Sequence, residues 1–83
     1  MKNEKTIHIR YYALLREERG LSEEAVKTVA QTPKELYKEL SVRHHFCLDD
    51  SAMKVAVNDV FQSWNTPLKN SDTVVFIPPV AGG

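Results

Sequence analysis

The chain closes on Thr73-Val74-Val75-Phe76-Ile77-Pro78-Pro79-Val80-Ala81-Gly82-Gly83, and the fold can be inferred outward from this stretch. Residues 73–77 are the most apolar run of the sequence, which predicts a strand inside a sheet. The two prolines cannot donate to a β-ladder and hold the backbone extended, so they end that strand. We therefore predict a folded domain over residues 1–77 and an extended C-terminal tail over residues 78–83.

The predicted tail carries no charged or polar side chain; it consists of Pro78, Pro79, Val80, Ala81, Gly82 and Gly83. A narrow tunnel can admit the two glycines because they lack side chains, and the terminal carboxylate is then nearly bare. At roughly 3.3–3.6 Å per residue, six residues reach about 20 Å from the last strand, far enough to enter an active site on another protein. The alternative is a frayed end in which small residues have no role. We expect the carboxylate of Gly83 to be the functional group.

Length and composition indicate one small folded domain. A chain of 83 residues buries only about 60–65% of its unfolded surface, which leaves little room for an internal catalytic pocket. Eleven basic residues balance eleven acidic ones, so no charge excess indicates nucleic acid or a membrane surface as partner. The single cysteine, Cys47, excludes an internal disulfide. No apolar run suggests a signal peptide or a membrane span, so we expect a cytoplasmic protein.

Hydrophobic periodicity predicts a mixed sheet with one main helix. Strands are expected over residues 5–13, 24–30, 53–57, 60–62 and 73–77, with the second one at an edge of the sheet. A short helix over residues 13–19 closes at Gly20, and Leu14 or Leu15 should lie under the sheet. Thr32-Pro33-Lys34-Glu35 has the form of a capping box and starts the main helix, which should end near His44. The expected class is α+β, with that helix on one face.

No internal cluster of side chains predicts catalysis or metal binding. His8, His44 and His45 do not have metal-ligand spacing, so we expect surface histidines and no metal site. We expect Cys47 to be a half-buried structural thiol, with a redox role as the alternative. Asp49 and Asp50 are adjacent and diverge in an extended loop, which indicates a solvated turn. With no catalytic or metal-binding role expected for the histidines, the cysteine and the two aspartates, the Gly83 carboxylate is the remaining candidate for the reactive group.

Strand parity also predicts a docking surface for a partner. Ile7, Ile9 and Tyr11 should face the main helix, as should Val74 and Phe76 in the last strand. The residues of opposite parity then form an exposed apolar patch on the helix-free side of the sheet, which a monomer does not need. The expected patch residues are Tyr12, Phe61, Val75 and Ile77.

The sequence resembles the small-subunit family of molybdopterin synthase, whose members are ubiquitin-like sulfur carriers. The resemblance is carried by Tyr11-Tyr12-Ala13-Leu14-Leu15-Arg16-Glu17, Thr32-Pro33, Val55-Ala56-Val57-Asn58, Pro67-Leu68, Asp72 and the ending Phe76-Ile77-Pro78-Pro79-Val80-Ala81-Gly82-Gly83. Ala81 departs from the family, which often has threonine or serine there. The resemblance implies a β-grasp, or ubiquitin-like, fold with about five strands.

The resemblance also implies a function that the chain does not perform alone. Gly83 is expected to be adenylated by an enzyme related to ubiquitin activators, which uses ATP, and then converted to a thiocarboxylate by a persulfide-bearing sulfurtransferase. The large synthase subunit would accept the tail, in a heterotetramer of two small and two large subunits, and sulfur would pass to the pterin precursor of the molybdenum cofactor. No cofactor is expected to bind the chain itself.

Two other functions share this tail chemistry. One is a sulfur carrier for thiamine thiazole synthesis or tRNA thiolation, and the other is a ubiquitin-like protein modifier that is conjugated to lysines. The Pro-Pro-Val-Ala-Gly-Gly ending over residues 78–83 favours the molybdopterin pathway over the other sulfur-carrier pathways. The protein modifier stays open as an alternative, because it shares the tail chemistry.

Overall fold

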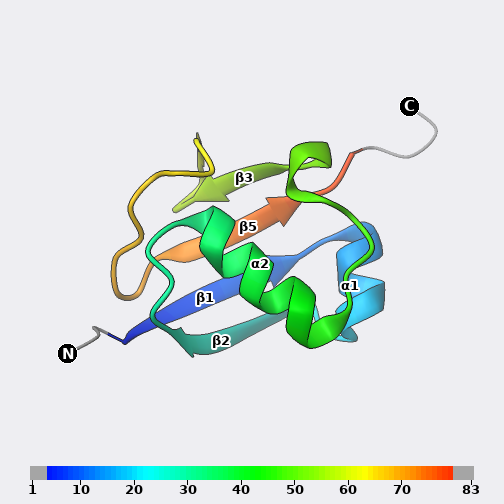
Figure 1. Ribbon diagram of the computed structural model, residues 1–83, viewed down its shortest axis with the longest axis horizontal. Coiled ribbons are helices and arrows are strands. Elements are labelled where there is room, and N and C mark those ends of the chain that lie inside the picture. The colour runs from blue at the N-terminus through cyan, green and yellow to red at the C-terminus, as the bar shows by residue number, and fades with distance from the viewer. Residues whose placement is uncertain (1–3, 80–83) are drawn as a thin grey trace.

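The computed structural model describes residues 4–79 and contains one mixed sheet of five strands (Figure 1). The strand order is β2-β1-β5-β3-β4; β1 and β5 pair in parallel, and the other neighbours are antiparallel. The elements are β1 (Lys5–Tyr11), α1 (Ala13–Arg19), β2 (Glu23–Thr28), α2 (Pro33–His44), the 3₁₀ turn η1 (Asp50–Ala52), β3 (Lys54–Val57), β4 (Val60–Gln62) and β5 (Thr73–Ile77). The predicted α+β class is therefore confirmed.

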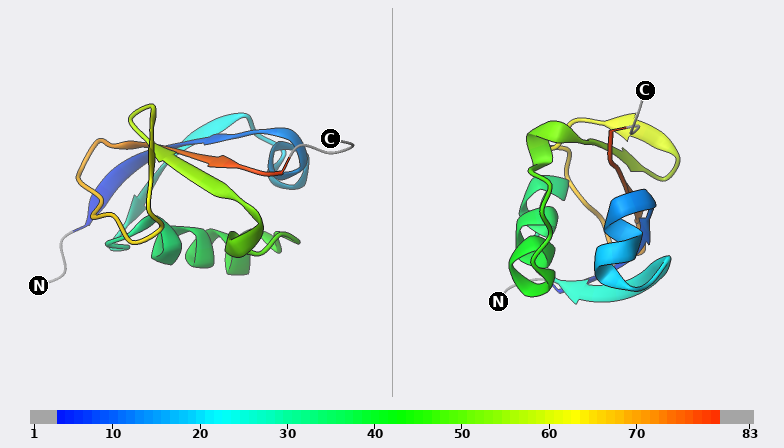
Figure 2. Two further views of the ribbon diagram at one scale, coloured as in Figure 1. Left: turned by 90° about the horizontal axis from the view of Figure 1, so that it is seen from above. Right: turned by 90° about the vertical axis from the view of Figure 1, so that its right-hand side faces the viewer.

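Helix α2 lies across one face of the sheet, and no helix of residues 4–79 covers the opposite face (Figure 2). The strand residues predicted to face it are buried, with Ile7, Ile9 and Phe76 each 0% exposed. Helix α2 contributes Leu36, Tyr37 and Leu40 to the same core. Because the side chains of a strand alternate between faces, the parity that buries these residues also decides which residues lie on the helix-free face.

Helix α2 begins as the sequence predicts, with one difference in its capping. The Thr32 hydroxyl accepts a hydrogen bond from the backbone N–H of Glu35, and Pro33 occupies the first turn. The Glu35 carboxylate accepts from the backbone N–H of Gln31, at 2.9 Å, and not from that of Thr32. At the other end, His45 has a left-handed conformation (φ 57°) that closes the helix.

The β3–β4 hairpin is built on Asn58 and Asp59, which both have positive φ (51° and 69°). This matches the primed turns that suit the twist of a hairpin and favour Asn and Asp. The Asn58 side chain donates to the buried carboxylate of Asp72, at 2.9 Å, and accepts from the backbone N–H of Thr73, at 3.0 Å. These bonds join the hairpin to the start of β5.

The bounds of β1 and β2 differ from the sequence-based expectation. Strand β1 ends at Tyr11 instead of residue 13, because α1 starts at Ala13. Strand β2 spans residues 23–28, and it lies at an edge of the sheet as predicted. Trp64 lies outside the regular elements, and its ring stacks on that of Phe76 with centroids 5.8 Å apart.

Candidate functional site

Strand β5 occupies the middle of the sheet and leads directly to the predicted tail. Tyr11 of β1 lies beside Phe76 in the register, and Lys54 of β3 lies beside Ile77. The strand runs toward the side of the molecule on which α1 lies (Figure 1). The chain thus leaves the sheet from a strand that is hydrogen-bonded to β1 on one side and to β3 on the other. This pairing fixes the position at which the predicted tail starts.

The predicted tail falls mostly outside the described residues. Pro78 is buried and Pro79 is exposed, so the first tail residue packs against the domain. Val80, Ala81, Gly82 and Gly83 lie beyond the part of the chain that the structure describes. Their role remains a prediction from the sequence.

The helix-free face carries a row of side chains that crosses four strands. The register places Arg10 beside Val75, Val75 beside Ala56, and Ala56 beside Phe61. Phe61 is 67% exposed, and Tyr12, which follows β1, is 45% exposed. Ile77 is half-buried. We call the surface formed by Tyr12, Ala56, Phe61, Val75 and Ile77 the outer patch.

Val75 differs from the expectation for an exposed patch residue, because it is only 7% exposed. It does not belong to the core under α2, so its side chain is on the predicted face. It lies in the central strand between Arg10 and Ala56, and neighbouring strands on both sides restrict access to a short side chain. Val75 therefore lies at the base of the outer patch, where little of its side chain reaches solvent. The aromatic side chains of Phe61 and Tyr12 are the most exposed parts of the outer patch.

Basic side chains border the outer patch, a feature that sequence reasoning did not identify. Arg10 belongs to the row itself, and Lys54 places its Nζ 6.0 Å from the ring centroid of Phe61. A shallow groove of about 540 Å³ beside the patch is lined by His8, Arg10, Glu23 and other residues of β1, β2 and β5. His8, Arg10 and Tyr12 are alternate residues and therefore point to the same face of the sheet, so the sequence pattern could have revealed the basic side chains beside the patch. This face suits a partner that is apolar and has acidic residues nearby.

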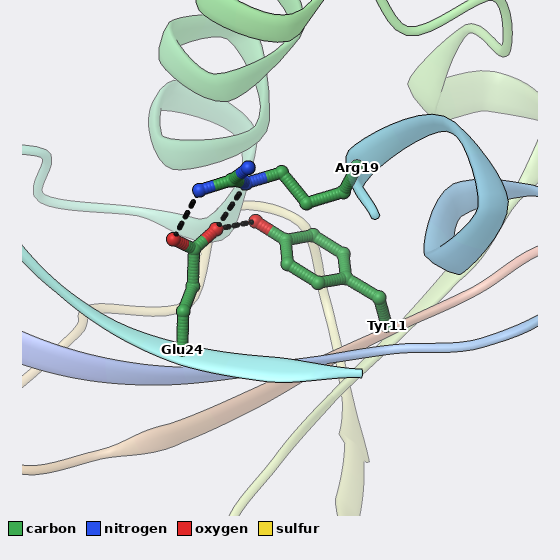
Figure 3. A network of polar contacts seen from close by, with 3 residues as sticks. All are labelled: Tyr11, Arg19 and Glu24. Carbon is green, nitrogen blue, oxygen red and sulfur yellow. Dashed lines mark hydrogen bonds and ion pairs between the residues drawn. The ribbon is translucent and has the colours of Figure 1, made fainter. Parts of the chain in front are cut away.

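A polar network ties α1 to the strand next to β5 (Figure 3). The Tyr11 hydroxyl donates to the Glu24 carboxylate at 2.7 Å. The Arg19 guanidinium donates to both oxygens of the same carboxylate, each at 2.8 Å. This bidentate geometry is among the stronger forms of ion pair.

The network shifts the proton equilibria of its members in opposite directions. The hydrogen bond from Arg19 holds the pKa of the Glu24 carboxyl below its usual range, which opposes the effect of burial. Burial raises the pKa of the Tyr11 phenol, and the hydrogen bond to Glu24 adds to this. The phenol therefore stays neutral and acts as a structural donor. The network holds the end of β1, which is the neighbour of β5 at the base of the tail.

Cys47 is exposed, so the expectation of a half-buried structural thiol is wrong. Its backbone N–H donates to the Glu18 carboxylate at 3.3 Å. A hydrogen bond and the negative charge of the same carboxylate raise the pKa of the Cys47 thiol. The thiolate is the nucleophilic form of cysteine, so this environment makes the thiol less reactive and does not favour a redox role.

We expect Cys47→Ser to retain in full the sulfur-transfer activity that the sequence resemblance implies, and to have an unchanged melting curve, because the thiol is exposed and its thiolate is disfavoured. Single-turnover sulfur transfer and thermal unfolding of the variant measure the two expectations. A folded Cys47→Ser protein that cannot transfer sulfur would place the sulfur on this side chain instead of the C-terminus.

The histidines are dispersed over the domain, with His8 on β1 and His44 and His45 at the end of α2. Within residues 4–79, no three His, Cys, Asp or Glu side chains group closely enough to hold a metal ion. The same described residues include no helix with the length and hydropathy of a membrane span.

Comparison with known proteins identifies the family to which this geometry belongs. A model of the ThiS family matches residues 9–83. The chain is 31% identical over 80 residues to the molybdopterin synthase sulfur carrier subunit of Escherichia coli strain K12; the match covers 93% of this chain and 99% of that protein.

Two solved structures are similar to the described fold. The complex of subunits 1 and 2 of molybdopterin-converting factor from Helicobacter pylori contains a chain that is 28% identical, with a TM-score of 0.62, coverage of 94% of this chain and 99% of that chain. Small archaeal modifier protein 1 from Methanosarcina acetivorans has a TM-score of 0.76, at 19% identity and with coverage of 98% and 99%. The second likeness shows the fold alone, which is the ubiquitin-like β-grasp that the sequence resemblance implies.

Proposed function

The chain belongs to the ThiS family, and on that basis we propose that it is the sulfur carrier subunit of a molybdopterin synthase. The observation that carries this proposal is the match to the family model, which extends from residue 9 through Gly83. The match includes both β5, the central strand of the sheet, and the Gly-Gly ending that follows it. Identity to a molybdopterin synthase sulfur carrier, over nearly the whole of both chains, selects this pathway among the functions with the same tail chemistry.

The chemistry of the proposed function takes place on the carboxylate of Gly83. An oxygen of the carboxylate attacks the α-phosphate of ATP, pyrophosphate leaves, and the product is a mixed anhydride with AMP. The terminal sulfur of a persulfide then attacks the carbonyl carbon and displaces AMP, and a thiol cleaves the remaining sulfur–sulfur bond. The product is a thiocarboxylate, which can pass its sulfur to a pterin precursor. No residue of the domain takes part in bond making, so the chain is not an enzyme by itself.

The proposal requires three partners. An adenylating enzyme related to ubiquitin activators binds and uses ATP, a sulfurtransferase supplies the persulfide, and a large synthase subunit holds the pterin. The complex of the two converting-factor subunits from Helicobacter pylori supports a large-subunit partner, and we extend this to a heterotetramer of two small and two large subunits. The proposed reactions take place in the cytoplasm, the compartment that the sequence predicts for this chain.

The direct test is to incubate the purified chain with ATP, its activating enzyme and a sulfur donor, and to measure its intact mass. We expect exchange of one oxygen for sulfur, located at Gly83 by fragmentation. Adding the large subunit and the pterin precursor should restore the original mass as sulfur is delivered. Stable conjugates between Gly83 and lysines of other proteins, with no thiocarboxylate formed, would instead indicate a protein modifier.

The outer patch supplies the binding energy that a short tail cannot. Ordering an extended segment has an entropic cost that few side chains in the tail offset. Phe61 is the most exposed apolar residue of the patch; Lys54 lies beside its ring, and Arg10 lies at the opposite end of the row, beside Val75. We propose that Tyr12, Phe61 and Ile77 contact both the large subunit and the activating enzyme, with Val75 beneath them.

We expect Phe61→Ala to weaken binding to both partners by about 2 kcal/mol, or roughly 30-fold, because it removes a central aromatic anchor. Ile77→Ala should have an effect in the same direction. Titration calorimetry measures the affinity, and thermal unfolding of each variant tests its fold. The matched control is Val42→Ala, because Val42 is 72% exposed on α2, away from the patch. Equal loss of affinity for the control and the patch variants would contradict the assigned surface.

A further inference from the structure

The free edge of β2 has the features of a self-pairing strand, and we propose that it pairs antiparallel with β2 of a second copy of this chain. Strand β2 lies at one end of the strand order, and among the described residues 4–79 no strand lies beyond it in the sheet (Figure 1). The paired copies would form one continuous sheet across the β2–β2 junction. This inference concerns a surface that the proposed sulfur chemistry does not use.

The register with β1 shows which backbone groups of β2 point outward. The backbone N–H of Tyr11 donates to the carbonyl of Ser22, at 2.8 Å, so this opposed pair is of the hydrogen-bonded type. Two residues along, Ile9 and Glu24 form the next such pair, and the alternation continues along β2. The backbone groups of Glu23, Ala25 and Lys27 are therefore directed to the open edge. Within residues 4–79, no turn or loop hydrogen bond engages them.

The charge pattern of β2 selects one register for self-pairing. A two-fold axis through Ala25 places Glu23 of each copy opposite Lys27 of the other, so both charged residues gain an opposite charge. An axis through Val26 places Lys27 opposite Ala25, and an axis through Glu24 places Glu23 opposite Ala25. Axes through Glu23 or Lys27 bring like charges together. The Ala25 axis is thus the one that pairs every outward charge on this edge with its complement.

The same register satisfies the requirements of the backbone. Glu23, Ala25 and Lys27 all have outward N–H and C=O groups, so each opposed pair can exchange two backbone hydrogen bonds. All three side chains are exposed, so no buried group has to move. A lysine on an edge strand ordinarily discourages pairing, and of the axes compared above only the one through Ala25 places a glutamate opposite it.

The proposed pairing leaves the outer patch and the tail accessible. In the strand order, β1 and β5 separate β2 from β3 and β4, which carry Ala56 and Phe61. The contact area of two short strands is well below that of a stable dimer, so we expect a dissociation constant on the order of 0.1–1 mM. Dimers would form where the chain is locally concentrated, as in an assembly that holds several copies.

Sedimentation equilibrium of the full chain, at concentrations up to about 1 mM and low salt, tests the proposal. We expect a monomer–dimer equilibrium for the natural sequence. Glu23→Lys alone and Lys27→Glu alone each place like charges at both ends of the junction and should weaken dimerisation roughly 5- to 30-fold. A mixture of these two variants restores both opposite-charge pairs, so it should form heterodimers with at least the affinity of the natural chain. High salt should reduce the differences in dimerisation between the natural chain, the single variants and their mixture.

Two controls separate edge pairing from general charge attraction. Glu17→Lys and Lys38→Glu make the same net charge changes at exposed positions on α1 and α2, and alone or mixed they should leave dimerisation unchanged. Ala25→Pro removes an outward N–H without removing a bond to β1, so it should abolish dimers in a chain that still melts cooperatively.

Because Glu23 lies beside Arg10 in its own chain, the melting curve of Glu23→Lys is measured as well. A chain that stays monomeric at 1 mM, about ten times the lower bound of the expected dissociation constant, or a dimer that Ala25→Pro leaves intact, overturns the proposal.

Discussion

Deletion of Gly83 is expected to abolish thiocarboxylate formation, and with it all sulfur transfer, without changing the fold. The deletion moves the terminal carboxylate onto Gly82 and shortens the predicted tail by one residue, about 3.3–3.6 Å. A reacting atom that is displaced by this distance no longer reaches the active site of the activating enzyme, since near-attack geometry tolerates much smaller errors. Intact-mass spectrometry after reaction with ATP and a sulfur donor measures the loss, and circular dichroism measures the fold.

The matched control for this deletion is Ala81→Ser, which adds a hydroxyl to the predicted tail and leaves its length unchanged. We expect it to retain thiocarboxylate formation, because the carboxylate and the tail length are unchanged. If the chain without Gly83 still supports sulfuration of the pterin precursor by the purified large subunit, the assignment of Gly83 as the sulfur-bearing residue is wrong.

Phe76→Ala is expected to destabilise the domain by about 3–5 kcal/mol, while Phe61→Ala changes its stability by less than about 0.5 kcal/mol. Phe76 is 0% exposed, and its ring lies 5.1 Å from that of Tyr37 and 5.8 Å from that of Trp64. A domain of this length has a total stability of roughly 4–12 kcal/mol, so loss of the Phe76 ring removes a large part of it. Phe61 is the same residue type on the opposite face, with 67% of its surface exposed.

Urea unfolding of both variants measures this difference in stability, with the same dependence of the unfolding free energy on urea concentration used for both. The pair of variants separates core from docking surface, because Phe61→Ala should lose affinity and keep stability. If Phe61→Ala unfolded as easily as Phe76→Ala, the helix-free face would be part of the core, and its assignment as a docking surface would fail.

Much of the fold follows from local patterns in the sequence. The alternation of Ile7, Ile9 and Tyr11 predicts both the existence of β1 and the face that it buries. The Thr32-Pro33 start and the Asn58-Asp59 turn are also local signals, since each depends on the backbone preferences of a few adjacent residues. Gly20 closes α1 with a φ of 79°, for the same reason.

Less of the candidate site could be predicted, because exposure depends on neighbours that are distant in sequence. Strand parity places Val75 on the helix-free face, but only its position between Arg10 and Ala56 explains why it is 7% exposed. Cys47 follows an amphipathic helix and would suit a half-buried position, yet the loop after α2 turns it to solvent, next to Glu18.

The sequence by itself determined the strands, the helices, the inward faces and the apolar Gly-Gly ending, because these depend on periodicity and on local backbone chemistry. The tertiary structure alone decided that β5 lies between β1 and β3, that Arg10 and Lys54 border the outer patch, and that Arg19 and Tyr11 meet on Glu24. The physical reason is that strand order and register bring together residues far apart in the chain. Those contacts depend on the packing of the whole domain and leave no local pattern in the sequence.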